Sequence, residues 1–371
     1  MVQVPGRLLF NCCKAYPERI NLDWLEKNPG KLFHTDTMVK DRLLMLEDKP
    51  CDSCYHGCYK QENKGLISTR QIPKNNNAYI EDAHSPMVNL QISLSTDCNL
   101  SCVYCSPEYS TAWQREVANG GEYSIGDHNI ASDNWTTLWS KMKQKSRSTQ
   151  SKFFELLLKE IELAKGLKRI SLLGGEPLLN SELTRIIDRA HDKSVQVVTG
   201  LGVSDTRLLQ LLDKVKGLNV HFSVSAESTN ENFEFVRHGI SWTDIVRRVQ
   251  IIKEHGFKVD FISTISNLSI FDFANFCQYA GQTPIGLNHV QTPHFLSPHV
   301  LDDKSKQKFL QKLDIIGEHA SAVVKMVEKD ASDYDRKNIG IYLQQLSHRR
   351  SKSLSFLPKH FLKWCGVNAL D

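Results

Sequence analysis

Three cysteines with spacings of four and three residues are the strongest chemical signal in this chain. Cys98, Cys102 and Cys105 directly follow Val88–Ser95, where apolar and polar residues alternate as in a strand. A structural zinc site normally takes four protein ligands, and no obvious fourth lies nearby. Three thiolates on a [4Fe–4S] cube would leave one iron open to a substrate or cofactor. The spacing therefore favours such a cluster over three buried structural cysteines.

A glycine-rich tetrapeptide, Gly174-Gly175-Glu176-Pro177, follows the next predicted strand, Arg169–Leu173. Two glycines let the backbone approach a ligand closely, and Glu176 offers a carboxylate to an ammonium group. Alone, these residues would equally suit a plain turn. Their place one strand after the three cysteines favours a ligand-binding loop.

With Tyr104 before the last cysteine, the CxxxCxxC pattern resembles the signature of the radical S-adenosylmethionine (radical SAM) superfamily, and Gly174–Pro177 resembles its GGEP motif. The resemblance implies that Cys98, Cys102 and Cys105 hold a [4Fe–4S] cluster whose open iron binds SAM. Gly174, Gly175, Glu176 and Pro177 would grip the amino group of SAM. The reduced cluster would cleave SAM to a 5′-deoxyadenosyl radical, which takes a hydrogen atom from the substrate. An electron donor such as flavodoxin or ferredoxin is implied as a partner.

The same resemblance extends to polar residues at the ends of later predicted strands. Thr199 precedes Gly200 where relatives often have Thr-Asn-Gly, so the Asn is missing here. Ser225 and Glu227 resemble a Ser-x-Asp pattern, with Glu in the Asp place, and would suit ribose hydroxyls. Arg237 matches an arginine that can reach the SAM carboxylate, and Asn267 a polar residue after the fifth strand. Ordinary structural roles remain alternatives for Ser225, Arg237 and Asn267.

Five further cysteines precede the CxxxCxxC pattern: Cys12, Cys13, Cys51, Cys54 and Cys58. They could bind an auxiliary iron–sulfur cluster or zinc, or stay unligated. Cys51–Arg70 resembles the lead-in of radical SAM proteins with a twitch-type domain, which favours the cluster. Downstream of the motif only Cys277 and Cys365 remain. These two, with Tyr109, are candidates to return a hydrogen atom, although a lone cysteine is more often a core residue.

The elements that must position these residues are strands alternating with helices. The six expected strands are Val88–Ser95, Arg169–Leu173, Val195–Thr199, Val220–Ser225, Phe257–Ile265 and Leu287–Gln291. Helices are expected at Phe153–Lys165, Glu182–His191, Leu208–Val215, Trp242–His255 and Phe271–Tyr279. Such βα units imply a parallel sheet with right-handed crossovers. Six units, rather than eight, predict an α/β fold with an open, partial (βα)6 barrel and its chemistry at the C-terminal ends of the strands.

Three regions follow from this pattern. Residues 1–85 are expected to form a small Cys-rich module stapled by metal. Residues 86–300 would form the radical SAM barrel, with 115–150 as an insertion. Residues 301–371 would form a helical C-terminal extension, with helices at Lys304–Glu328 and Asp333–His348.

Composition limits the class of protein. The chain has 371 residues, 40% of them hydrophobic and 24% charged, which excludes a fibrous or wholly disordered protein. No run approaches the roughly 18 apolar residues of a membrane helix, and residues 1–13 make a poor signal peptide, so we expect a cytoplasmic protein. The net charge of +4 does not require a nucleic-acid partner. The basic runs Lys141–Lys152 and His348–Lys352 are expected to be solvated.

Two alternatives to a radical enzyme stay open at this point. One is a non-enzymatic zinc or iron–sulfur protein that binds RNA through its basic runs. The other keeps the fold but uses SAM without radical chemistry. The substrate is not identified by the sequence: peptides, sugars and nucleotide-derived molecules are all compatible with the resemblance.

Overall fold

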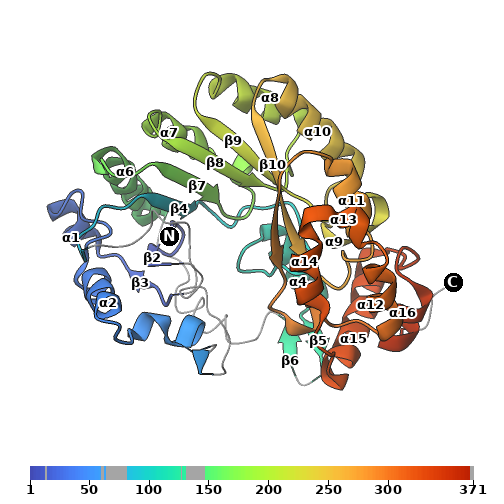
Figure 1. Cartoon of the computed structure of the whole chain (residues 1–371). Coiled ribbons are helices and arrows are strands. Elements are labelled where there is room, and N and C mark those ends of the chain that lie inside the picture. The colour runs from blue at the N-terminus through green and yellow to red at the C-terminus, as the bar shows by residue number, and fades with distance from the viewer. Residues whose placement is uncertain (13–14, 60–61, 64–81, 127, 131–146, 368–371) are drawn as a thin grey trace.

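The computed structural model describes residues 1–12, 15–59, 62–63, 82–126, 128–130 and 147–367. Its centre is a nine-stranded sheet with the strand order β11-β10-β9-β8-β7-β4-β1-β2-β3 (Figure 1). Six strands run parallel in chain order, as expected: β4 (Asn89–Ser93), β7 (Arg169–Leu173), β8 (Ser194–Thr199), β9 (Val220–Ser225), β10 (Lys258–Ile265) and β11 (Ile285–His289). The fold is therefore α/β, and the sheet is an open, partial barrel.

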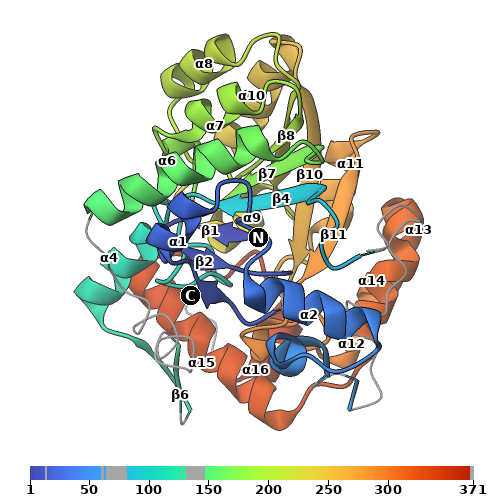
Figure 2. The ribbon, with the colours of Figure 1, turned by 90° about the vertical axis from the view of Figure 1, so that its left-hand side faces the viewer.

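Helices cover the outer face of the sheet and connect its strands (Figures 1 and 2). They are α6 (Arg147–Leu163), α7 (Leu183–Arg189), α8 (Asp205–Lys214), α9 (Asn230–Val236), α10 (Trp242–Glu254) and α11 (Phe273–Ala280). Serine side chains cap α8 and α10 by accepting hydrogen bonds from backbone N–H groups three residues later. Helix α9 is not predicted from the sequence, since its seven residues are too few to show a helical period.

The inner side of the sheet carries polar residues that bond across neighbouring strands. The Ser171 hydroxyl donates to the Gln196 side chain (2.8 Å), whose amide donates to Ser223 (2.7 Å). Val195 and Val197, which alternate with Gln196 on β8, are buried on the opposite side. The helices thus enclose an apolar layer, while the concave side of the sheet stays polar.

The N-terminal residues are not a separate module, contrary to the expectation for 1–85. β1 (Val2–Gln3) pairs in parallel with β4 and so extends the barrel sheet. Antiparallel β2 (Leu8–Leu9) and β3 (Glu18–Arg19) follow at the edge, and helices α1 (Leu22–Lys27) and α2 (Asp36–Leu46) complete this part. Leu25 and Met38 belong to the same continuous core as the barrel strands. Buried apolar residues therefore stabilise this region in addition to any metal.

The expected insertion, 115–150, is also part of the core where the structure describes it. Helix α4 (Thr111–Gly120) leads to the hairpin β5 (Tyr123–Ile125) and β6 (His128–Ile130). Tyr123 and Ile125 are buried, and Tyr123 packs edge-on against Trp113 and against Tyr342 of the C-terminal region. Residues 131–146 lie outside the described residues.

The C-terminal region is helical, as expected, but its first helix is divided. Instead of one helix over 304–328, the structure has α12 (Asp303–Leu310), α13 (Leu313–Ile316) and α14 (Ala320–Val327). Gly317, with φ +61°, ends α13 in a conformation that other residues rarely adopt. α15 (Asp333–Arg350) and α16 (Lys359–Cys365) follow, and α15 packs on β5. Along the described residues, no helix has the length and apolar character that crossing a bilayer requires.

Candidate functional site

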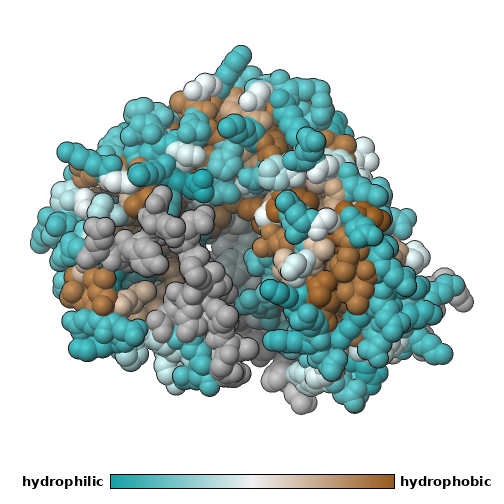
Figure 3. Space-filling view, viewed as in Figure 1, coloured by the Kyte–Doolittle hydropathy of each residue, from teal (hydrophilic) through white to brown (hydrophobic). Residues whose placement is uncertain are grey.

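A cavity of about 820 Å³ lies at the C-terminal ends of the parallel strands. All three barrel-motif cysteines line it, as do residues that follow β7, β8, β9 and β11 and residues of α15. In the space-filling view, this face of the molecule is hollowed near its centre (Figure 3). The expected residues on its wall are Cys98, Cys102, Tyr104, Cys105, Gly174, Gly175, Glu176, Thr199, Ser225 and Arg237. Segments far apart in the sequence, from Cys98 to Asn338, thus meet at one site.

The loop that carries the three cysteines is held in place from both sides of its backbone. The N–H groups of Ser101 and Val103 donate to the carbonyls of His238 (2.8 Å) and Val236 (2.9 Å), which follow or end α9. Four of the loop's carbonyl oxygens accept hydrogen bonds from side chains: Cys98 from Thr111, Leu100 from Ser110, Cys102 from Trp113 and Val103 from Tyr342. The cysteines therefore sit on a fixed backbone.

The three thiols lie in a buried environment that they share. Burial raises the pKa of Cys98 to about 11, and the neighbouring Cys102 adds to this shift. Burial also raises the pKa of Cys102, and raises that of Cys105 above its usual range together with Cys102 and Cys98. A bound metal counteracts this rise in the thiol pKa values, because its positive charge favours the thiolate.

The thiol arrangement fits a cube better than a single ion. Among the described residues, no three His, Cys, Asp or Glu side chains form a group that could hold one metal ion. A [4Fe–4S] cube makes a different demand, because each thiolate ligates a different iron. Of the described residues that line the cavity, three are cysteines, which is the number that leaves one iron open.

The two glycines of the Gly174–Pro177 loop are required by contact with the cysteine loop. A Cβ on Gly175 would lie 2.4 Å from the carbonyl oxygen of Asp97, and one on Gly174 would lie 2.8 Å from that of Ser95. Gly174 also has φ +136°, which side chains disfavour. The N–H groups of Gly175 and Glu176 donate to those same two carbonyls (2.8 and 2.7 Å). The motif therefore joins the β7 loop tightly to the loop after β4.

The Glu176 carboxylate is already saturated with hydrogen bonds, which differs from its expected role on the SAM ammonium group. Oε1 accepts from the Thr199 hydroxyl (2.6 Å) and the Leu178 N–H (3.1 Å). Oε2 accepts from the N–H groups of Gly200 (3.0 Å) and Gly202 (3.2 Å). A carboxylate offers about four lone-pair positions, and these four donors occupy them. Burial nevertheless raises the pKa of Glu176, against the effect of these bonds.

Tyr104, Glu227 and Arg237 form a buried network beside the cysteines. The Tyr104 hydroxyl donates to Oε1 of Glu227 (2.9 Å), and Arg237 donates to Oε2 from Nε (3.1 Å) and Nη2 (2.7 Å). The guanidinium also lies 5.7 Å from the centre of the Tyr104 ring. Burial acts to lower the pKa of Arg237, but Glu227 and its neighbours raise it above its usual value. The arginine is therefore charged, and Glu227 meets these two partners rather than the cavity.

The remaining expected residues divide between the cavity wall and the protein interior. Ser225 and Tyr109 line the cavity. Asn267 is buried, and its amide donates to the carbonyls of Phe295 (2.8 Å) and Val300 (3.2 Å), so it holds the segment after β11. Cys277 on α11 and Cys365 on α16 do not belong to the described lining of the cavity.

The early cysteines gather where the segment around residue 12 meets the segment around residue 53. The N–H of Tyr16 donates to the Ser53 carbonyl (2.6 Å), and Cys51, Cys54 and Cys58 are buried. Burial raises the pKa of Cys54 to about 12, helped by Cys51 and by the charge of Cys12. Cys13 lies outside the described residues. Cys12, Cys51 and Cys54 are thus close enough to affect one another.

Polar residues on the opposite wall of the cavity are missed by sequence reasoning. They are Asn288, His289, Gln291, His294, Tyr334, Asp335 and Asn338. They come from the end of β11, from the segment after it and from the first turns of α15, which no motif links. Only the end of the sixth strand, where barrel chemistry is expected, could have pointed to the first four.

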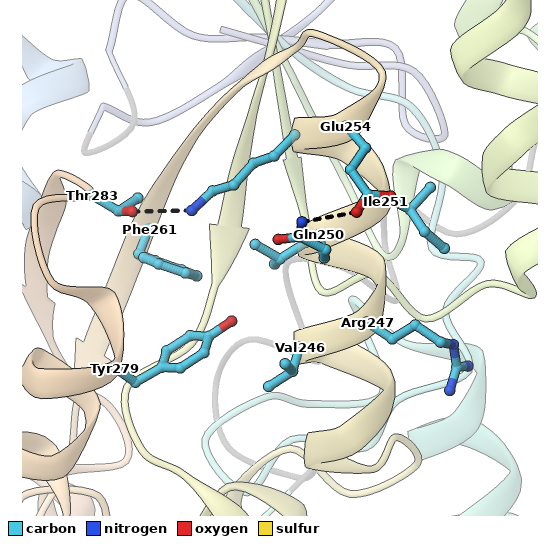
Figure 4. Close-up of a pocket in the computed structure, with 10 residues that line it drawn as sticks. Val246, Arg247, Gln250, Ile251, Glu254, Phe261, Tyr279 and Thr283 are labelled. Atoms are coloured by element: carbon cyan, nitrogen blue, oxygen red, sulfur yellow. Dashed lines mark hydrogen bonds between the residues drawn. The ribbon is translucent and has the colours of Figure 1, made fainter.

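Two other features do not belong to this site. A cavity of about 510 Å³ lies between α10 and α11 on the outside of the sheet and is lined by Arg247, Gln250, Phe261 and Tyr279 among others (Figure 4). None of the expected site residues lines it. The expected solvated run His348–Lys352 is partly structural, because Arg350 is buried against Glu116 (3.1 Å). Arg349 lies 4.0 Å from the Tyr123 ring centre.

This chain is similar to known proteins in sequence and in structure. Residues 92–280 match the model of the Radical SAM superfamily. The chain is 25% identical over 209 residues to a GTP 3′,8-cyclase of Aquifex aeolicus, covering 53% of this chain and 55% of that protein. It is 23% identical over 282 residues to Molybdenum cofactor biosynthesis protein 1 of Mus musculus, covering 75% and 38%. The solved structure of native anSMEcpe with bound AdoMet is similar over 66% of this chain and 64% of that one, with 16% identity and a TM-score of 0.43. The chain spans about half the length of the curated relatives it matches.

Proposed function

This chain belongs to the Radical SAM superfamily, and we propose that it is a radical SAM enzyme in which Cys98, Cys102 and Cys105 hold the cluster. The superfamily implies a [4Fe–4S] cluster and SAM, and its members are enzymes, so a non-enzymatic RNA-binding protein is no longer a competing explanation. One observation carries the proposal: the three thiols and the loops after β7, β8 and β9 line a single cavity.

The chain's own residues would bind and orient the cofactor. When bound, cluster and SAM supply a one-electron cleavage of SAM whose product removes a hydrogen atom from a substrate. The backbone around Gly174 and Gly175 would bind the amino group. The Ser225 hydroxyl would meet the ribose, and Nη1 of Arg237, which the Glu227 pair does not use, would meet the carboxylate. Glu176 would position the Gly200–Gly202 backbone.

We propose a second metal site at Cys12, Cys51 and Cys54, with Cys13 or Cys58 as a further ligand. The support is the burial of Cys51, Cys54 and Cys58 and the mutual effect of the other thiols on Cys54. An auxiliary iron–sulfur cluster is the form we favour. Zinc is the alternative, and it would require these side chains to move closer together, because no three described ligand side chains form a group that could hold one metal ion. A substrate derived from a peptide, sugar or nucleotide, and an electron donor such as flavodoxin or ferredoxin, complete the proposal.

Reductive cleavage of SAM tests the proposal directly. Anaerobically reconstituted protein, reduced with dithionite, should form 5′-deoxyadenosine from SAM. The triple variant Cys98→Ala, Cys102→Ala, Cys105→Ala should not, and it should lose about four irons, the content of one cube. Cys277→Ala is the matched control, because this cysteine does not line the cavity. Equal product from the triple variant, or a SAM-derived product other than 5′-deoxyadenosine, would contradict radical chemistry at this loop.

A further inference from the structure

A histidine–aspartate pair lies on the cavity wall outside the segment that matches the family. His294 belongs to the short 3-10 helix His294–Leu296 after β11, and Asp335 to the first turn of α15. Nδ1 of His294 lies 3.0 Å from Oδ1 of Asp335, and both residues line the cavity that the three thiols share. We propose that His294, oriented by Asp335, is the proton-accepting group that faces the substrate. This inference rests on the proposed function, because it assigns the substrate side of the same cavity.

Asp335 is fixed before any ligand binds. Its side chain is 7% exposed, and its Oδ2 accepts a hydrogen bond from the Ser332 hydroxyl (2.5 Å). Ser332 is also the N-cap of α15 and accepts the Asp335 N–H (3.1 Å). A carboxylate in the first turn of a helix is favoured by the positive end of the helix dipole. Oδ1 is therefore presented to His294 in one orientation.

The contact with Asp335 selects the tautomer of His294. A carboxylate accepts a hydrogen bond, so Nδ1 carries the proton and Nε2 of the neutral ring is an acceptor. The side chain is 62% exposed, and Nε2 lies on the ring edge away from Asp335, available to a ligand in the cavity. In general base catalysis, one group accepts the proton and a second group holds the first in the correct orientation. His294 and Asp335 have this arrangement.

The proton balance is simple. An O–H or N–H group of the substrate gives its proton to Nε2, and the resulting imidazolium is stabilised by the Asp335 carboxylate at Nδ1. The ring centre of His299 lies 4.8 Å from that of His294, and burial lowers the pKa of His299 to about 4. His299 is therefore neutral at pH 7 and does not oppose the new charge. His289 and Tyr334 also line the cavity, and the charges of Lys329 and Lys306 act on His299.

Neighbouring side chains indicate the class of substrate. Asn288, Gln291, Asn338 and Tyr334 add amide and phenol groups to the same wall. Such groups form hydrogen bonds with hydroxyl, amine and amide groups. The expected substrate is therefore a polar molecule with a hydroxyl or amino group that His294 can deprotonate.

Chemical modification tests the state of His294 without a known substrate. Diethyl pyrocarbonate acylates neutral imidazole nitrogen, and His294 and His299 share the tryptic peptide 259–304, so mass spectrometry compares them directly. His294 should react much faster than buried His299. Replacing Asp335 by Asn should change the rate at which His294 is modified at pH 7, because the carboxylate no longer holds the ring at Nδ1. A histidine that Asp335 does not orient would react at the same rate in the wild type and in Asp335→Asn.

Two activity measurements separate this inference from the proposed function. His191→Ala, at an exposed histidine that does not line the cavity, is the matched control and should leave substrate-free formation of 5′-deoxyadenosine unchanged. A hexose, a nucleoside and a serine-containing peptide serve as defined probes. Any probe that stimulates the wild type should lose about 100-fold of its stimulated rate in His294→Ala and should keep it in His191→Ala. Reactivity of His294 no greater than that of His299, an unchanged rate of His294 modification in Asp335→Asn, or undiminished stimulation in His294→Ala would overturn the inference. Absence of 5′-deoxyadenosine from the wild type would instead refute the proposed function. The rates of His294 modification would still show whether Asp335 orients His294.

Discussion

Replacing Glu176 by Gln should destabilise the fold more than a lost cofactor contact would. The carboxylate accepts four hydrogen bonds, from Thr199, Leu178, Gly200 and Gly202. A glutamine keeps one acceptor oxygen and turns an NH2 group towards two of these donors. Hydrogen bonds to a charged group contribute about 1.5–3 kcal/mol each, so two losses amount to about 3–6 kcal/mol. Removing a buried charge returns part of its desolvation cost, which leaves an expected loss of about 2–4 kcal/mol.

Glu160→Gln is the matched control. Glu160 on α6 is also buried, burial raises its pKa, and it accepts the N–H groups of Gly30 (2.7 Å) and Leu32 (2.9 Å). Its surroundings lie apart from the thiol cavity. Both variants should unfold at lower denaturant concentration than the wild type. Only Glu176→Gln should also weaken SAM binding in equilibrium dialysis, because the displaced backbone after β8 forms part of the cavity wall.

One result would refute the reasoning. If Glu176→Gln unfolds at the wild-type denaturant concentration while SAM affinity falls tenfold or more, the four internal bonds contribute little. The carboxylate would then be a direct ligand of the ammonium group, as the family resemblance alone implies. Equal loss of SAM affinity in Glu160→Gln would show that the measurement reports general instability.

Three further changes have defined outcomes. In protein that lacks the barrel cysteines, adding Cys51→Ser and Cys54→Ser should remove about four remaining irons if the early site is a cube, or about one zinc otherwise, by metal analysis; unchanged metal content would exclude a site there. Glu116→Gln should lower the free energy of unfolding by about 3 kcal/mol at pH 7 and by less in acid, once the pH is below the folded pKa of Glu116. Burial acts to raise the pKa of Glu116, but Arg350 holds it below its usual value, so the pair's contribution is lost as pH falls through the folded pKa; equal loss at pH 7 and in acid would contradict this. Tyr342→Phe removes the 2.7 Å bond to the carbonyl in the cysteine loop and should cost about 1–2 kcal/mol and speed iron loss to a chelator, whereas unaltered iron release would show that the loop needs no such anchor.

The strands and the residues at their ends were accessible from the sequence. Alternation predicts β4, and strands that alternate with helices predict a parallel sheet, so the three cysteines and Gly174–Pro177 are expected to meet at one edge. Short elements gave no such signal. β1 has two residues, too few for any periodicity, and its place beside β4 depends on long-range pairing.

Roles of single residues were harder to predict than their positions. Glu176 and Glu227 are where the motifs place them, but their carboxylates bond to Thr199 and Arg237 rather than facing a ligand. A motif records which side chain is needed at a place. It does not record which partner satisfies that side chain, because the partner comes from a distant part of the chain and burial decides whether the bond matters.

Two separate parts of the sequence line the cavity. This explains why the cofactor chemistry can be inferred from the sequence more easily than the substrate. The residues that would bind cluster and SAM, from Cys98 to Arg237, all lie within the family match of 92–280. The opposite wall, which includes His294, Asp335 and Asn338, lies beyond it. An open six-stranded barrel needs another element to close this side, and α15 does so through Tyr342, which bonds to the cysteine loop, and through Asp335. Relatives that share the barrel can therefore share the cofactor chemistry and differ in the molecule on which they act, so the substrate must be sought through the segments at 288–294 and 334–338.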